Sequence, residues 1–191
     1  MAKLFGNNNT QQLSQYEVLA NRYQSARHNI LLILVFTLIN IFLLVTNSNS
    51  YFLFSASIPY YIVDLGMFLC GKYPAEYYAD IGGIDPLNNT FFAVMLAIAA
   101  VILVLYLLSW IFSKKPRVGW MIFALVFFVI DTLGMLWWVG FSSDMLIDIA
   151  FHGWVIVSLS MGIAAYFKLK NLPEEELPGE ETPQCCPEIE E

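Results

Sequence analysis

The stretch "YFLFSASIPYYIVDLGMFLCG", residues 51–71, decides how many times this chain of 191 residues crosses a membrane. It has the length of a membrane-spanning helix, which needs about 20 residues to cross a hydrocarbon layer of about 30 Å. Pro59, Asp64 and Gly66 interrupt its apolar character. Whether the stretch is a span therefore depends on the sequence on either side of it.

Four other apolar runs surround this stretch, and the composition places them in a bilayer. The chain is 58% hydrophobic and 13% charged, whereas a soluble domain carries about 25% charged residues. Runs that cross lipid form helices, because an open strand would leave its backbone groups without hydrogen bonds. The sequence therefore predicts an all-α, four-helix transmembrane bundle. Its spans lie at about residues 30–46, 91–112, 118–140 and 149–167.

The distribution of basic residues favours four spans over five. An excess of Lys and Arg marks the cytoplasmic side of a membrane protein. With four spans, eight of the nine basic residues fall on one side and only Lys72 falls on the other. Counting 51–71 as a span would move the sequence "KKPR", residues 114–117, to the opposite side. We therefore expect a multi-pass protein of the cell (inner or plasma) membrane, with the N and C termini in the cytoplasm.

This topology divides the chain into three parts. Residues 1–29 are a cytoplasmic N-terminal segment, in which apolar residues from Leu13 to Ala26 recur at helical spacing. Such a pattern predicts an amphipathic helix that lies at the inner interface. Residues 30–167 are the membrane domain. Its outer loop, 47–90, forms an extracytoplasmic cap between spans 1 and 2, and 51–71 either lies on the surface or enters the bundle as a re-entrant segment.

The third part, residues 168–191, is an acidic cytoplasmic tail. Residues 173–191 contain eight acids and no base, and removing them from a net charge of −7 leaves the rest of the chain close to neutral. The tail has too few apolar residues to form a core, so we expect it to be disordered.

The sequence "FSASIPYYIVDLG", residues 54–66, resembles outer-loop sequence of uncharacterised small bacterial multi-pass membrane proteins. The resemblance covers about residues 30–70. It implies a bacterial four-span membrane protein and no particular activity.

A few polar residues lie within or beside the apolar runs. Asp131 is inside the third span, and Asn40 has a comparable depth in the first. Asp148 and His152 are four residues apart, so they share one helix face near the outer end of the fourth span. A short connection makes the third and fourth spans antiparallel neighbours. We therefore expect a buried polar cluster of Asp131, His152, Asp148 and Asn40.

Two interpretations of Asp131 follow from its depth. A charged Asp in the middle of a bilayer costs about 2.5 kcal/mol or more, so it needs partners. As a structural residue, it forms a hydrogen bond with Asn40, with His152 or, when protonated, with a backbone carbonyl, and it fixes the helix register. As a functional residue, it forms a relay with His152, which titrates near neutral pH. The chain is then a proton- or cation-handling transporter or channel component.

A metal site is the third interpretation. Two carboxylates and one imidazole suit zinc or manganese. The candidate ligands are Asp148, His152 and one acid of the outer loop, either Asp80 or Asp85.

No catalytic motif accompanies these residues. The sequence lacks Gly-x-Ser-x-Gly, His-Glu-x-x-His and a phosphate-binding loop. No basic patch indicates a nucleic-acid partner, and we expect no cofactor. We therefore expect a non-enzymatic membrane protein and not an enzyme.

Small residues on the spans indicate close helix packing instead. Ala93, Ala97 and Ala100 lie on one run, and Ser158 and Gly162 on another. Small residues at such spacing let helices approach closely in a membrane. We therefore expect an assembly, accessory or regulatory subunit. Besides the lipid bilayer, its expected partner is a second copy of the chain or an unidentified membrane protein.

Overall fold

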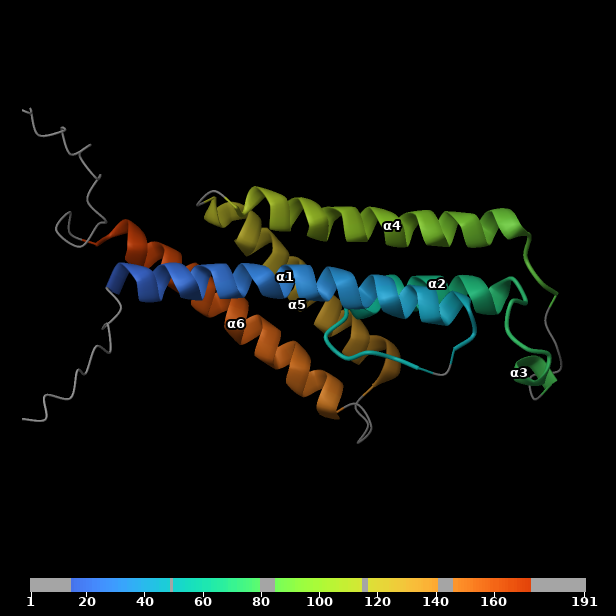
Figure 1. The fold of residues 1–191 in the computed structure, drawn as a ribbon. Helices are drawn as coiled ribbons and strands as arrows, with labels where there is room; N and C mark the ends of the chain where they lie inside the picture. The colour runs from blue at the N-terminus through green and yellow to red at the C-terminus, as the bar shows by residue number, and fades with distance from the viewer. Residues whose placement is uncertain (1–14, 49, 80–84, 115–116, 141–145, 173–191) are drawn as a thin grey trace, which may run out of the picture.

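The computed structural model describes residues 15–48, 50–79, 85–114, 117–140 and 146–172, and the elements in them are α-helices (Figure 1). Four helices are long: α1 (Gln15–Val45), α4 (Asn89–Phe112), α5 (Val118–Val139) and α6 (Leu146–Lys170). Two are short: α2 (Ser57–Leu69) and α3 (Glu76–Ala79). The prediction of an all-helical chain with four long apolar helices is confirmed for these residues. The tail predicted to be disordered was 168–191; its first residues, Lys168 to Lys170, are the end of α6, and the part beyond Leu172 lies outside the described residues.

Each long helix covers one predicted span to within one residue and is long and apolar enough to cross a membrane. Their outward surfaces are also apolar, because Val101 of α4, Leu133 of α5 and Val157 of α6 are exposed. Helices that are hydrophobic all round suit a lipid environment and not water. The described part of the chain is therefore that of a membrane protein.

Helix α1 is the central element, because it packs against α6, α4 and α2 (Figure 1). Ile30 and Ile33 of α1 form the middle of the core with Phe128 of α5 and Leu159 of α6. The start of α1 and the end of α6 lie at one end of the bundle, whereas α2 and α3 lie toward the other. We call the latter the α3 end.

Small residues bring the helices close together. A Cβ atom added at Gly162 of α6 would overlap the Cβ atom of Ala26 on α1. One turn away, the Asn29 side chain donates a hydrogen bond of 2.6 Å to the Ser158 hydroxyl. The predicted small-residue face of Ser158 and Gly162 is therefore the contact between α1 and α6.

The segment predicted to be an amphipathic helix at the inner interface is part of α1. Helix α1 begins at Gln15 and continues without a break to Val45. Its apolar residues Leu19, Tyr23 and Ala26 are buried in the protein, and Tyr23 and Ala26 pack with Met121 of α5. The apolar face predicted to contact lipid thus packs against neighbouring helices.

The same part of α1 donates hydrogen bonds to carbonyl groups at the C-terminal end of α4. The last carbonyl groups of a helix have no partner within that helix. The Tyr23 hydroxyl donates to the Ser113 carbonyl at 2.9 Å, and Arg27 Nε donates to the Trp110 carbonyl at 3.1 Å. Arg27 also lies over the Trp110 ring, 5.1 Å from its centroid. These contacts explain why an arginine can be buried between apolar helices.

Residues 51–71 enter the bundle and return to the end from which they came (Figure 1). After α1, residues 50–56 run back alongside it, and α2 then leads out again. Thr37, which bonds to Ala56 at the turning point, is eight residues before Val45, so the start of α2 lies roughly 12 Å inside the end of α1. At 13 residues, or about 20 Å, α2 is too short to cross a bilayer.

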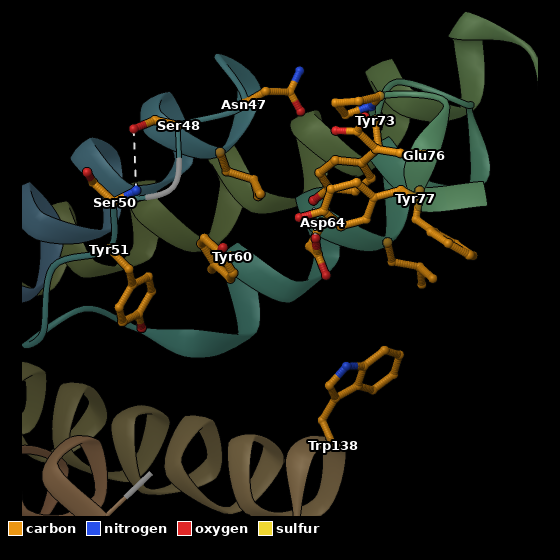
Figure 2. Close-up of a pocket in the computed structure, with 14 residues that line it drawn as sticks. Asn47, Ser48, Ser50, Tyr51, Tyr60, Asp64, Tyr73, Glu76, Tyr77 and Trp138 are labelled. Atoms are coloured by element: carbon orange, nitrogen blue, oxygen red, sulfur yellow. Dashed lines mark hydrogen bonds between the residues drawn. The ribbon is translucent and has the colours of Figure 1, made fainter. Parts of the chain in front are cut away.

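The α3 end of the molecule has a cavity of about 960 Å³ between the end of α1, helices α2 and α3, and Trp138 (Figure 2). Tyrosines and two acids line much of it. Besides Trp138, the lining residues labelled in Figure 2 are Asn47, Ser48, Ser50, Tyr51, Tyr60, Asp64, Tyr73, Glu76 and Tyr77.

The contact of Gly162 with Ala26 leads to a stability prediction. Gly162→Ala forces α1 and α6 apart, because both Cβ atoms are fixed to helix backbones and cannot rotate away. We expect the free energy of unfolding to fall by about 1–3 kcal/mol, as in other overpacked cores. Equilibrium unfolding of the purified protein in mixed micelles measures it.

Gly153→Ala is the matched control, because it lies on the same helix and an added Cβ there meets no atom within 4 Å. Equal unfolding free energies for the two variants would contradict the close contact.

Candidate functional site

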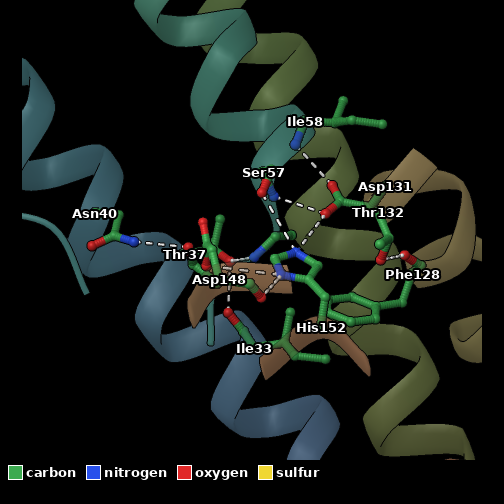
Figure 3. Close-up of polar contacts among 12 residues, drawn as sticks. Ile33, Thr37, Asn40, Ser57, Ile58, Phe128, Asp131, Thr132, Asp148 and His152 are labelled. Carbon is green, nitrogen blue, oxygen red and sulfur yellow. Dashed lines mark hydrogen bonds and ion pairs between the residues drawn. The ribbon is translucent and has the colours of Figure 1, made fainter. Parts of the chain in front are cut away.

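Asp131 of α5 binds the start of α2 with both of its carboxylate oxygens (Figure 3). The backbone N–H of Ser57 donates to Oδ2 and that of Ile58 donates to Oδ1, each at 2.8 Å. The first N–H groups of a helix lack partners within it and carry partial positive charge, which favours a carboxylate. Asp131 is only 2% exposed, so this acid is an internal cap for a buried helix end.

The remaining N–H groups of the first turn are also accounted for. The N-cap residue Ala56 has no side chain that could cap the helix, and its own N–H donates to Thr37 Oγ1 at 2.8 Å. Pro59 has no N–H to satisfy. With Ser57 and Ile58 bound to Asp131, no N–H of this turn is left unpaired. That is the condition for ending a helix in an apolar interior, where an unpaired group costs several kcal/mol.

His152 of α6 lies between two carboxylates. Its Nδ1 atom is 2.9 Å from the Asp148 carbonyl, and because a carbonyl only accepts, Nδ1 carries the hydrogen. Its Nε2 atom is 3.5 Å from the Ser57 hydroxyl and 3.6 Å from Asp131 Oδ2, while Nδ1 is 3.8 Å from Asp148 Oδ1. The ring stacks on Phe128, with centroids 5.0 Å apart. A neutral His152 accepts at Nε2 from Ser57, and a protonated one donates there toward Asp131.

Asn40 binds the segment that precedes α2, and not Asp131. Its Nδ2 atom donates to the Phe52 carbonyl at 2.7 Å and to the Ser55 hydroxyl at 2.8 Å. Its Oδ1 atom accepts from the Phe52 N–H at 2.8 Å. The Asn40 amide thus pairs with both backbone polar groups of Phe52, as a neighbouring strand would. The structure brings Asp131, Asp148 and His152 together, as predicted, and places Asn40 at a separate contact of the same segment.

Phe54 occupies the turn between the extended piece and α2. Its φ of 70° lies in the left-handed region, which bulky residues rarely adopt. The ring packs on Phe151, with centroids 4.0 Å apart, and edge-on to Trp154. These contacts on α6 stabilise the side chain, so tertiary packing offsets the backbone strain.

The candidate metal ligands do not form a metal site in the described residues. Within that part of the chain, no group of three His, Cys, Asp or Glu side chains could hold a metal ion. Asp85 is exposed, and Asp80 lies outside the described residues. Asp148 Oδ1 accepts no hydrogen bond from the described residues. Oδ1 is 3.8 Å from Nδ1 of the His152 ring.

Sequence reasoning missed two parts of this site, Thr37 and the start of α2. A helix that starts beside a proline has a recognisable signal, since Pro is tolerated in a first turn. "ASIP", residues 56–59, carries that signal. No sequence signal identified Thr37, because a threonine in a span commonly bonds to its own helix, as this one also does with Ile33.

Comparison with known proteins gives no match: no family model, no curated protein and no solved structure is similar to this chain. Functional inference therefore depends on the geometry of the site.

The cap on α2 leads to a prediction for Asp131→Asn. The amide can accept only one of the two N–H bonds, and its NH₂ group faces the other N–H. A buried donor left unpaired costs about 1–3 kcal/mol, so we expect lower stability and faster hydrogen exchange in residues 51–58. Hydrogen exchange with mass spectrometry on the purified protein measures both.

Thr132→Val is the control, because the adjacent Thr132 hydroxyl bonds to the Phe128 carbonyl of its own helix. If residues 51–58 exchange at the same rate in wild type, in Thr132→Val and in Asp131→Asn, Asp131 does not hold α2.

Proposed function

We propose that this chain is a non-enzymatic integral membrane protein that acts as an assembly, accessory or regulatory subunit. In this proposal the four long helices span the bilayer and hold residues 50–69 as a re-entrant segment. The supporting observation is the bonding of Asp131, whose two oxygens are both used by the backbone of α2. These two backbone bonds give the buried Asp131 a structural role that requires no substrate.

The core between the site and the end where α1 begins favours a structural role over transport. Asn29 and Ser158 form the next polar pair toward the opposite end of the bundle. Ile33, Phe128 and Leu159 belong to a buried core that also contains Tyr106, whose hydroxyl has no hydrogen-bond partner among the described residues. Among the described residues, no chain of hydrogen bonds therefore connects His152 with Asn29 and Ser158.

An exposed small-residue face on α4 supports assembly. Ala93, Ala97 and Ala100 are exposed, in contrast to the Ser158 and Gly162 pair, which α1 covers. Small residues on a lipid-facing surface allow the helix of another protein to approach closely. We propose that this face binds a second copy of the chain or a partner membrane protein.

The charges support a plasma-membrane location with both termini inside. Arg22 is exposed at the end where α1 begins, and Lys72 is at the α3 end. Cytoplasmic surfaces carry the excess of basic residues. Labelling of native Cys185 or Cys186 in intact cells by a membrane-impermeant maleimide would contradict this orientation. The other described basic residues at the first end are Arg27, Lys114, Arg117, Lys168 and Lys170.

The assembly proposal is tested by cysteine crosslinking in native membranes. In a chain with Cys185 and Cys186 changed to serine, we expect Ala97→Cys to give a disulfide-linked dimer, or a crosslink to one partner. Leu133→Cys is the control, since Leu133 is 60% exposed on a different helix. Free monomer alone for Ala97→Cys, or equal crosslinking at both positions, would count against the α4 face.

A second candidate function is proton or cation handling, and the position of His152 favours it. The ring nitrogens are 3.6 Å from Asp131 and 3.8 Å from Asp148. The Asp148 side chain is 12% exposed, so one of the two carboxylates beside His152 reaches the protein surface. One imidazole between two carboxylates is an arrangement that can pass a proton.

Proton flux into proteoliposomes separates the two candidates. The structural proposal expects wild-type protein to give the same flux as protein-free liposomes. Flux in wild type that His152→Gln abolishes and Thr132→Val leaves unchanged would replace the structural proposal with the relay.

A further inference from the structure

Two cavities at the α3 end share a wall. The larger, of about 960 Å³, and a smaller one of about 240 Å³ are both lined by Leu65 of α2 and Trp138 of α5. The two cavities therefore lie next to each other.

The larger cavity is acidic and aromatic. Asp64 and Glu76 line it together with Tyr60, Tyr73 and Tyr77 (Figure 2). The Tyr73 hydroxyl donates a hydrogen bond to Asp64, and its ring stacks on Tyr77 with centroids 5.1 Å apart. Burial, together with the Asp64 carboxylate, raises the pKa of Tyr73 well above its usual range, so the phenol stays a neutral donor. Carboxylates beside aromatic ring faces attract cations.

No basic side chain neutralises this cavity from within its lining, because its described lining residues include no Lys, Arg or His. Lys72 follows α2 closely in sequence but has other partners. Its Nζ atom donates to the Asn89 side chain at 2.9 Å and lies 5.0 Å from the centroid of the Phe92 ring. The negative charge of Asp64 and Glu76 is therefore available to a ligand.

The smaller cavity is apolar and opens on the surface of α2 and α5. Ile58, Ile62, Gly134 and Trp137 line it, and Trp137 is 89% exposed. Tryptophan is enriched at the boundary between lipid chains and headgroups. Trp137 and Trp138 lie at the end of α5, so the smaller cavity extends from this boundary toward the hydrocarbon.

We propose that the two cavities together bind an amphiphile with a positively charged amine head. The head lies in the larger cavity near Asp64 and Glu76, and the hydrocarbon chain lies along the smaller cavity, past Leu65 and Trp138. A membrane lipid with an amine headgroup and a free long-chain amine both have this chemistry. The site does not depend on the function proposed for Asp131.

Lipid retention by the full-length protein tests the site. The protein is reconstituted in bilayer discs of equal phosphatidylethanolamine and phosphatidylglycerol, and the lipids that remain bound are identified by native mass spectrometry. We expect phosphatidylethanolamine to be retained preferentially. Asp64→Asn should lower its retention about fivefold, the effect of one partly exposed ion pair. Asp85→Asn, an exposed acid that does not line the cavity, should leave retention unchanged.

Two further variants keep the test independent of the Asp64–Tyr73 bond. Glu76 and Trp138 are exposed, so Glu76→Gln and Trp138→Ala should fold normally and still lower retention, whereas Leu133→Ala should not. Equal retention of the two lipids by wild type, or no effect of Asp64→Asn, Glu76→Gln and Trp138→Ala, would overturn the proposal.

Competition then distinguishes the two sources of the amine. Displacement of phosphatidylethanolamine by dodecylamine, but not by butylamine, supports the site and shows that it accepts a free long-chain amine. Resistance to both amines, with the variant effects above intact, supports the site and identifies the lipid as its occupant. Displacement by butylamine as readily as by dodecylamine would overturn the role of the apolar cavity.

Discussion

The bond between the Asp131 carboxylate and the first N–H groups of α2 is the interaction on which the rest of the structure depends. A helix that starts inside an apolar bundle exposes polar groups to a medium that cannot bind them. Asp131 satisfies Ser57 and Ile58, Thr37 satisfies Ala56, and Pro59 needs no partner. The costs of a buried acid and of a buried helix end thus offset one another, because each supplies the partner that the other requires.

The two ends of the bundle are stabilised by different means. At the end where α1 begins, small residues allow contact between backbones, as at Gly162 and Ala26. Toward the α3 end, the inserted segment separates the helices, and polar side chains from α1, α5 and α6 bind it. Asn40 and Thr37 fix the extended piece, and Asp131 fixes the start of α2. Together these contacts give α2 a definite position that its short length could not give it alone.

The polar interior and the outer cavities are distinct features with different chemical character. Asp131 and His152 are buried, and their hydrogen-bonding partners belong to the chain itself. Asp64 and Glu76 instead line an open cavity with no basic residue among its described lining. The polar groups of the interior therefore bind the chain's own backbone, whereas the acids of the α3 end face an open cavity.

The sequence by itself determined that the chain is helical, that four apolar helices are long enough to cross a membrane, and that Asp148 and His152 share one helix face. These properties follow from the length and hydropathy of each run and from helical spacing, which are local. Only the tertiary structure decided that Asp131 accepts backbone hydrogen bonds, that Asn40 binds a different segment, and that Leu19, Tyr23 and Ala26 pack inside the protein. Those outcomes depend on how each helix is rotated and on where residues 50–69 enter the bundle, and both are set by contacts between residues far apart in the chain.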